Sequence, residues 1–204
     1  MHKRGYHHGN LHQALVDAAL ILIEQKGPTG SSLSEAAKSA GVTPAAVYRH
    51  FAGRDDLIAE MARQGYEIFA DLLVYAHDSS PTPLAALEAT GRAWLAFARR
   101  HPGHYIAMFE SGVVANRSDE LSRASRRALD VLETAAAALT QHMPPTRRPP
   151  PAMVSAHISA LSHGVVEIFA RGTPGTNSPF KPEDLLETGI GIYLRGLGLI
   201  APDD

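Results

Sequence analysis

The segment 32–51 most constrains the fold, because it predicts two short helices joined by a tight turn. Ser32 and Glu35 have the S-x-x-E spacing of a capping box, in which each side chain satisfies a backbone amide of the other residue. This spacing predicts a helix of about two turns that ends at Gly41, a residue suited to a positive φ. The Thr-Pro pair at 43–44 is typical of a helix start and predicts a second helix directly after the turn.

The spacing of small and apolar residues inside this segment supports the same interpretation. Ala37 lies four residues before Gly41 and is small where two helices would cross, while Val47 lies six residues after Gly41 and is expected to face inward. The second helix is expected to run through Phe51, which would join Ala40 and Val42 in a small apolar core. Two helices in this arrangement form a helix-turn-helix unit, whose second helix enters the major groove of DNA.

A helix is predicted on either side of this unit. Between residues 11 and 23 apolar residues recur at three- and four-residue steps, with Asn10 as the expected N-cap and Gly27–Pro28 as the stop. A long helix is expected to start at residues 53–56, with two acids in its first turn. The sequence therefore predicts a three-helix DNA-binding domain over residues 1–54.

The remaining chain, residues 55–204, keeps a helical period without sustained alternation or a hairpin signal, so the fold class is all-α. With the helices already described, the expected total is about nine helices. The further helical segments are expected at 83–100, 103–110, 119–141, 152–171 and 183–199, separated by proline- and glycine-rich breaks. This part is predicted to be a larger helical domain for effector binding and dimerisation.

Charge and composition restrict the function. The 204 residues contain no cysteine, which excludes disulfides, cysteine nucleophiles and cysteine-based metal sites. Residues 1–54 hold six lysines and arginines against three acids, a net charge of +3, whereas the rest of the chain carries −5. Such asymmetry indicates a nucleic-acid-binding part joined to an acidic remainder. The polar, basic N-terminus and the lack of about 18 uninterrupted apolar residues predict a cytoplasmic chain without a membrane partner.

Over residues 6–69 the sequence resembles the TetR family of transcriptional regulators. The stretches YHHGNLHQALVDAALILIEQKG and SLSEAAKSAGVTPAAVYRHFAGRDDLIAEM are similar to the whole N-terminal DNA-binding domain of that family. Residues 93–111 and 161–172 resemble a C-terminal subfamily known for a Trp and a His-Gly pair; His163–Gly164 matches the pair, and Ser159 stands where the Trp is expected. The resemblance implies a ligand-responsive repressor that binds a pseudo-palindromic DNA operator and needs no cofactor.

Ten residues are candidates for DNA contact. Residues 43–45 begin the reading helix, and the methyl groups of Thr43 and Ala45 suit thymine. Base specificity is expected from Arg49, from apolar contacts and from DNA shape. The resemblance implies phosphate contacts from Tyr48, His50 and Arg54, with a hydroxyl from Ser32 and a basic arm at the N-terminus. The full set is Lys3, Arg4, Ser32, Thr43, Pro44, Ala45, Tyr48, Arg49, His50 and Arg54.

A homodimer is expected, because two reading helices must lie one DNA turn apart, about 34–36 Å. The last two predicted helices are apolar most of the way round, so one side can face the chain's own core and the other a partner. The candidate dimer residues are Ile158, Leu161, Val165, Phe169, Ile190, Tyr193, Leu194 and Leu197.

The middle helices remain for an unidentified small-molecule effector. The candidate pocket residues are apolar or aromatic with histidine as a polar handle: Trp94, Phe97, His101, Tyr105, Met108, Phe109, Leu132 and His163. Two alternatives remain, a helical interaction protein without DNA binding and a histidine-based metalloenzyme. The sequence lacks an H-E-x-x-H pair, a G-x-S-x-G elbow and a P-loop, and we expect neither catalytic nor metal-binding residues.

Overall fold

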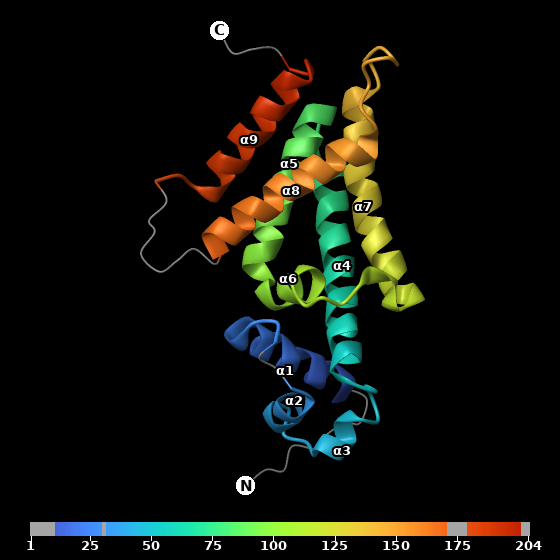
Figure 1. Cartoon of the computed structure of the whole chain (residues 1–204), viewed down its shortest axis with the longest axis vertical. Helices are drawn as coiled ribbons and strands as arrows, with labels where there is room; N and C mark the ends of the chain where they lie inside the picture. Colours follow the sequence, from blue (N-terminus) through green and yellow to red (C-terminus); the bar gives the residue numbers. More distant parts are fainter. Residues whose placement is uncertain (1–10, 30–31, 171–178, 201–204) are drawn as a thin grey trace. The chain divides into compact units, whose positions relative to one another are not determined.

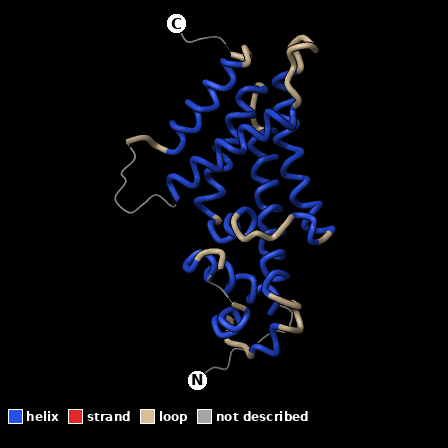
Figure 2. Tube along the Cα trace, in the orientation of Figure 1, coloured by secondary structure: helices blue, strands red, loops and turns tan. Residues whose placement is uncertain are grey.

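The computed structural model describes residues 11–29, 32–170 and 179–200, and every regular element within them is helical (Figures 1 and 2). The α-helices are α1 (Leu11–Lys26), α2 (Leu33–Ser39), α3 (Pro44–Val47), α4 (Arg54–Asp78), α5 (Pro83–Arg100), α6 (Pro102–Phe109), α7 (Asp119–Thr140), α8 (Pro151–Ala170) and α9 (Pro182–Gly196). A short 3₁₀ helix, η2 (Ala115–Arg117), lies between α6 and α7. The all-α prediction is confirmed.

The third helix is shorter than the sequence predicts. The expected helix through Phe51 is wrong, because α3 ends at Val47 and residues 48–50 form a turn. The Val47 carbonyl accepts hydrogen bonds from both the His50 amide, at 2.9 Å, and the Phe51 amide, at 3.0 Å. This sharing tightens the last turn, and Phe51 still reaches the core with 4% of its surface exposed.

Contacts within the chain divide it into two compact units. The first unit comprises residues 1–67 and 101–125, and the second comprises residues 68–100 and 126–204. The first unit therefore contains α1, α2, α3 and α6 together with the beginnings of α4 and α7. The boundary between the units lies within α4, after residue 67, and α6 belongs to the first unit. The boundary does not lie at the end of the helix-turn-helix segment.

The first unit is built around the apolar faces of its first three helices. Leu15, Val16 and Ile23 of α1 are fully buried, as are Ala37 of α2 and Val47 of α3. Burying one large aliphatic side chain stabilises the folded state by roughly 1.5–3 kcal/mol, so this small core orients the three helices firmly. The three- and four-residue spacing seen in the sequence is the direct cause of the arrangement.

Two glycines allow α6 to pack closely against its neighbours in the first unit. A Cβ atom on Gly103 would lie 2.7 Å from the carbonyl oxygen of Leu20 in α1. A Cβ atom on Gly65 of α4 would lie 2.6 Å from Sδ of Met108 and 3.0 Å from Cβ of His104. Side chains at these two positions would push α6 away from α1 and α4.

The second unit joins α5, α8 and α9. Gly91 of α5 lies against α9, where a Cβ atom would be 3.3 Å from Leu186 and 3.5 Å from Ile190. Arg92 pairs with Glu187 at 3.1 Å across the same pair of helices. These contacts hold the last helix against α5 by both apolar packing and charge.

Helix α8 is long and apolar enough to pass a test for a membrane span. Over residues 151–169 its mean hydropathy is 1.3, and a third of that window is buried. The helix packs within the second unit through buried Val154, Ile158 and Val166. Polar residues such as Ser155 and Ser162 are buried on it as well. One such helix is weak evidence for a membrane span, because the core helix of a globular protein passes the same test.

Candidate nucleic-acid interface

The start of α2 and the turn between α2 and α3 both have the geometry expected from their sequence. The Ser32 hydroxyl accepts a hydrogen bond from the Glu35 amide at 3.2 Å, and the Glu35 carboxylate accepts one from the Ser32 amide at 3.0 Å. Gly41 has a φ of 72°, in the left-handed region that glycine adopts at no steric cost. The Val42 amide then donates to the Ala37 carbonyl at 2.9 Å. The predicted capping box and glycine turn are confirmed.

The segment from residue 43 to residue 51 separates into a buried side and an exposed side. Val47 is fully buried and Phe51 is nearly so, whereas Tyr48 between them is 61% exposed. The exposed side consists of Thr43, Pro44, Ala45, Tyr48, Arg49 and His50, all six of them candidates for DNA contact. The structure thus brings these six together on one surface.

The other candidates for DNA contact have different surroundings. The Ser32 hydroxyl is also a donor, at 3.1 Å, to the Glu35 carboxylate. Arg54 is half-buried, and its guanidinium donates to the Pro28 carbonyl and lies 3.9 Å from the Asp55 carboxylate. Arg54 therefore joins the loop after α1 to the start of α4. Lys3 and Arg4 lie outside the described residues.

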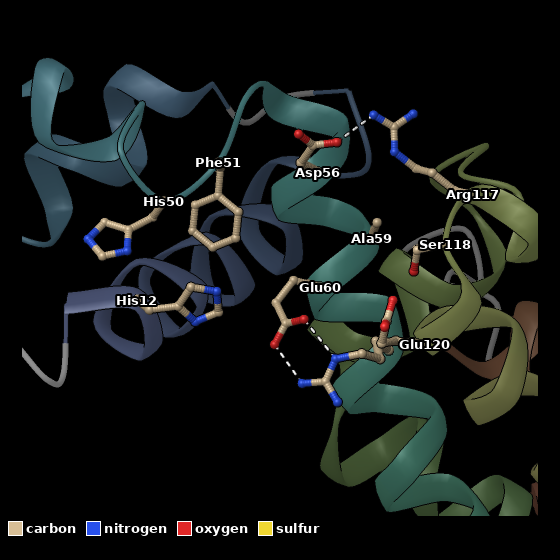
Figure 3. Close-up of a pocket in the computed structure, with 10 residues that line it drawn as sticks. His12, His50, Phe51, Asp56, Ala59, Glu60, Arg117, Ser118 and Glu120 are labelled. Atoms are coloured by element: carbon tan, nitrogen blue, oxygen red, sulfur yellow. Dashed lines mark hydrogen bonds and ion pairs between the residues drawn. The ribbon is translucent and has the colours of Figure 1, made fainter.

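An open groove of about 610 Å³ runs beside the exposed surface within the first unit (Figure 3). The His12 ring of α1 lies 4.8 Å from the Phe51 ring and 6.1 Å from the His50 ring, measured between centroids. Acidic and basic side chains line the rest of the groove: Asp56, Glu60, Arg63, Arg117 and Glu120. His12 could not be predicted as a member of this groove, because no local sequence pattern relates residue 12 to residues 50 and 51.

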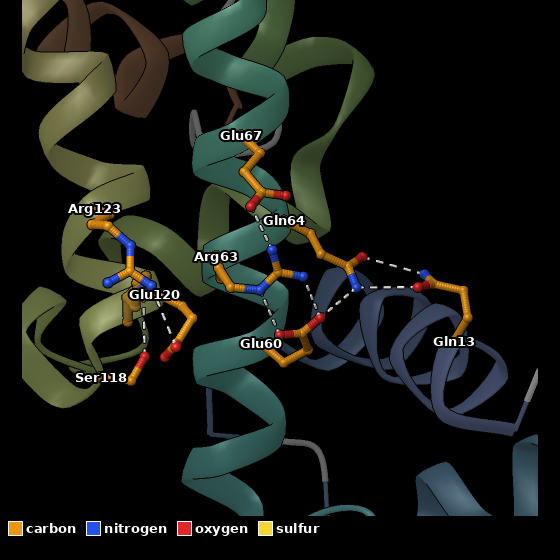
Figure 4. Close-up of polar contacts among 9 residues, drawn as sticks. Gln13, Glu60, Arg63, Gln64, Glu67, Ser118, Glu120 and Arg123 are labelled. Carbon is orange, nitrogen blue, oxygen red and sulfur yellow. Dashed lines mark hydrogen bonds and ion pairs between the residues drawn. The ribbon is translucent and has the colours of Figure 1, made fainter.

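A polar network joins α1 to α4 along the same unit (Figure 4). The amides of Gln13 and Gln64 exchange hydrogen bonds of 3.2 and 3.1 Å, and Gln64 also donates to Glu60 at 2.8 Å. Arg63 donates twice to Glu60, at 2.7 and 2.6 Å, and pairs with Glu67. Burial raises the pKa of Glu60, but the hydrogen bonds from Arg63 and Gln64 outweigh it and leave this pKa below its usual value.

The network positions α1 relative to α4 and was also missed. The E-x-x-R-Q-x-x-E spacing of residues 60–67 signals pairs three and four residues apart on one helix. Nothing in that spacing indicates the partner Gln13, which is 51 residues away from Gln64.

The eight candidate pocket residues are divided between the two units. Trp94, Phe97, Leu132 and His163 belong to the second unit, and His101, Tyr105, Met108 and Phe109 belong to the first. In the second unit the Trp94 ring lies 4.9 Å from both the Phe69 ring and the His163 ring. A small apolar pocket of about 130 Å³ in that unit is lined by other residues: Leu95, Ala98, Arg99, Val166, Phe169 and Pro182.

The candidate dimer residues of α8 and α9 divide by burial. Ile158, Val165, Ile190 and Leu194 are at most 5% exposed in the single chain, so they belong to its own core. Leu161, Phe169, Tyr193 and Leu197 are half-buried. The large apolar side chains that these helices expose are Met153, Ile168 and Ile192, at 52%, 55% and 62%.

The described residues contain no group of three or more His, Asp or Glu side chains placed to hold a metal ion. Several of the described histidines lie beside an aromatic or histidine ring. The His157 Nδ1 atom, for example, lies 2.9 Å from the Tyr193 hydroxyl, and His101 lies 5.9 Å from His104 between ring centroids.

Comparison with known proteins places this surface in context. The chain is 31% identical over 111 residues to the HTH-type transcriptional regulator BetI of Rhizobium meliloti, which is 54% of this chain and 55% of that one. The chain therefore spans about half the length of this curated relative.

Two solved structures share the fold over nearly the whole chain. A transcriptional regulator of Rhodococcus sp. RHA1 is 26% identical with a TM-score of 0.70, covering 94% of this chain and 99% of that one. AibR in complex with isovaleryl coenzyme A and operator DNA is 19% identical with a TM-score of 0.66, covering 89% and 97%.

Two family descriptions match the sequence itself. Residues 15–61 match the description "bacterial regulatory proteins, tetR family", and residues 87–193 match the tetracyclin repressor-like C-terminal domain. The first match contains α2, the glycine turn and the exposed surface after it, and the second extends from α5 into α9. Because the second match alone spans more than half of the chain, this protein belongs to the tetR family of bacterial regulatory proteins.

Proposed function

We propose that this chain is a sequence-specific DNA-binding transcriptional repressor that acts as a homodimer in the cytoplasm and not as an enzyme. A small-molecule effector releases it from a pseudo-palindromic operator. One observation carries the proposal: Thr43, Ala45, Tyr48, Arg49 and His50 are exposed together, while Val47 and Phe51 of the same segment are buried in the core of the helix-turn-helix. A helix-turn-helix presents its reading residues to DNA in this way.

The chemistry of the exposed surface defines how it would read DNA. Residues 43–45 provide methyl and methylene groups, which suit thymine methyls, and no side chain there can make a two-pronged hydrogen bond to guanine or adenine. Arg49 is the side chain on this surface that can make such a bond to guanine. Tyr48 and His50, both exposed, would donate to phosphate oxygens. Specificity then depends on Arg49, on methyl contacts and on DNA shape.

Dimerisation would use the exposed apolar side chains of α8 and α9. Met153, Ile168 and Ile192 are exposed on these helices, and contact with a second chain would remove their apolar surface from water. A second copy of the chain would cover the same surface on both copies by two-fold symmetry. Two reading surfaces would then meet two half-sites of the operator.

Control by an effector requires thermodynamic linkage between effector binding and DNA binding. The structure of AibR was solved with both a coenzyme A thioester and operator DNA, and a shared fold allows a comparable arrangement here. In this chain Phe69, Trp94 and Phe97, together with His163, would supply the apolar and polar groups of an effector site in the second unit. An effector that weakens DNA binding must itself bind less tightly, by the same factor, when DNA is bound.

The test is a salt series of binding to a duplex taken from upstream of the coding sequence. The double variant Arg49→Ala, His50→Ala is compared with a control, His142→Ala, Arg147→Ala, which removes the same residue types from exposed positions in the second unit. We expect specific binding with a steep salt dependence, a large loss in the first variant and no loss in the control.

Equal weak binding by all three proteins would leave two explanations, a different operator or no sequence-specific binding. Selection from random duplexes separates them. If no sequence is enriched by the wild type over the Arg49→Ala, His50→Ala variant, the proposed function is wrong.

A further inference from the structure

Arg117 joins the segment after α6 to the first turn of α4. This residue ends η2, and its Nη2 atom lies 2.6 Å from Oδ1 of Asp56 while its Nη1 atom lies 3.7 Å from Oδ2 of Asp55. The other oxygen of Asp56 accepts a hydrogen bond from the Ala52 amide at 3.1 Å. Arg117 therefore contacts the carboxylate that holds the backbone directly after the proposed reading segment.

The contact is close to the proposed DNA surface. His50 and Phe51 line the same groove as Asp56 and Arg117, on the walls drawn in Figure 3. His50 is one of the exposed candidates for phosphate contact, and Phe51 anchors its segment in the core. The carboxylates and the reading segment thus belong to one surface of the first unit.

Two carboxylates beside a phosphate-binding surface weaken DNA binding unless cations offset them. Asp55 and Asp56 follow Arg54 directly in the sequence, and Arg54 is 3.9 Å from Asp55 with its guanidinium also bonded to Pro28. Arg117 pairs with both carboxylates. The hydrogen bond to Asp56 raises the pKa of Arg117 above its usual value, so the guanidinium is charged at every pH relevant to DNA binding.

We propose that Arg117 is a positioning residue for DNA binding, which offsets the charges of Asp55 and Asp56 and, through Asp56, holds Ala52 at the end of the reading segment. Arg117 acts without touching DNA. The inference rests on the proposed function, because it concerns the same surface. Through Arg117, the DNA affinity of the helix-turn-helix would also depend on the segment between α6 and α7.

The test is a cycle of three variants measured on a duplex that the wild type binds. Arg117→Ala is expected to weaken binding roughly threefold to tenfold at low salt, and this loss should shrink as added salt screens the carboxylates. Asp55→Asn with Asp56→Asn removes both charges and keeps an oxygen that can accept from Ala52, so affinity should hold or rise. Adding Arg117→Ala to that pair should then change affinity less than about twofold, because no charge remains for Arg117 to offset.

Two further variants separate charge from folding. Arg126→Ala is the matched control, because Arg126 pairs with an exposed carboxylate, Asp130, at 3.1 Å in the second unit, and its loss should leave affinity unchanged. Arg117→Lys keeps the positive charge and should lose less affinity than Arg117→Ala, although one ammonium group cannot reproduce both contacts of the guanidinium. Circular dichroism melting of each variant verifies that the fold is kept.

Several results would overturn the inference. A loss from Arg117→Ala that persists in the Asp55→Asn, Asp56→Asn background would show that Arg117 contacts DNA itself, and a loss that is independent of salt would show a role in folding alone. Unchanged affinity in Arg117→Ala would refute it while the proposed function stands. If the wild type enriches no DNA sequence, both proposals fail together.

Discussion

Replacing Gly103 by alanine is the sharpest test of the packing described for the first unit. The added Cβ atom would lie 2.7 Å from the carbonyl oxygen, 3.2 Å from the carbonyl carbon and 3.3 Å from the Cα atom of Leu20. All three are backbone atoms of α1, so no side-chain rotation can relieve the contact. Carbon–oxygen contacts of this kind usually lie at about 3.3–3.6 Å, so α6 and α1 must separate by roughly half an ångström or more.

The size of the effect follows from two opposing contributions. Overpacking of a filled interior costs about 1–3 kcal/mol. Alanine favours a helix over glycine by up to about 1 kcal/mol, and less near the first turn, where Gly103 lies. We therefore expect Gly103→Ala to lower the free energy of unfolding by about 1–2 kcal/mol.

Urea unfolding followed by circular dichroism at 222 nm measures this difference in both units. The single tryptophan, Trp94, belongs to the second unit, so its fluorescence reports unfolding there. Gly164→Ala in α8 is the control, because its Cβ atom meets nothing within 4 Å, and it should stabilise the protein slightly. Gly65→Ala should cost less than Gly103→Ala, because its closest contact is the flexible end of Met108. An unchanged or raised urea midpoint for Gly103→Ala would refute the close approach of α6 and α1.

Three other outcomes are expected. Ser32→Ala should lower stability by about 1 kcal/mol in thermal melting because it removes the capping box, whereas Ser34→Ala in the same helix should have little effect; equal losses would contradict the cap. Burial, with a smaller contribution from His101, lowers the pKa of His104 to about 4, below its usual 6.5. Protonation of His104 therefore favours the unfolded state, and up to about 3 kcal/mol of stability, less for partial solvent screening, should be lost as pH falls from 6.5 through 4. His104→Gln should flatten a urea-midpoint profile over that range, and an unchanged profile would contradict the assignment. Gln13→Ala and Gln64→Ala should show a coupling of roughly 0.5–1 kcal/mol in a double-mutant cycle, and additive losses would mean that the amide pair contributes nothing.

The helix starts and stops could be predicted because their signals act between near neighbours. The Ser32–Glu35 box closes within three residues, and Gly41 adopts its positive φ for reasons of its own backbone. The buried faces of α1 and α2 follow from apolar spacing within single helices. The exposed side of the reading segment follows from the same local pattern, with Val47 and Phe51 turned inward.

Contacts between side chains far apart in the sequence could not be predicted from these local signals. Arg54, a candidate for DNA contact, also donates to the Pro28 carbonyl, and Arg117 was not singled out although it pairs with two carboxylates about sixty residues earlier. The early end of α3 depends on how its last turn packs, and a four-residue difference in helix length lies within the range that tertiary contacts decide.

The dimer and pocket candidates show the same limit. The apolar spacing within a helix can be predicted from the sequence, but the burial of each side chain cannot. The types and spacing of residues along the chain indicate that α8 and α9 are largely apolar and that aromatic residues gather in the middle helices. Packing between helices buries Ile158, Val165, Ile190 and Leu194 in the core of the single chain and leaves Met153, Ile168 and Ile192 exposed. Periodicity determines which side chains share a face of a helix, but burial depends on which other helix packs against that face, and this is a property of contacts distant along the chain.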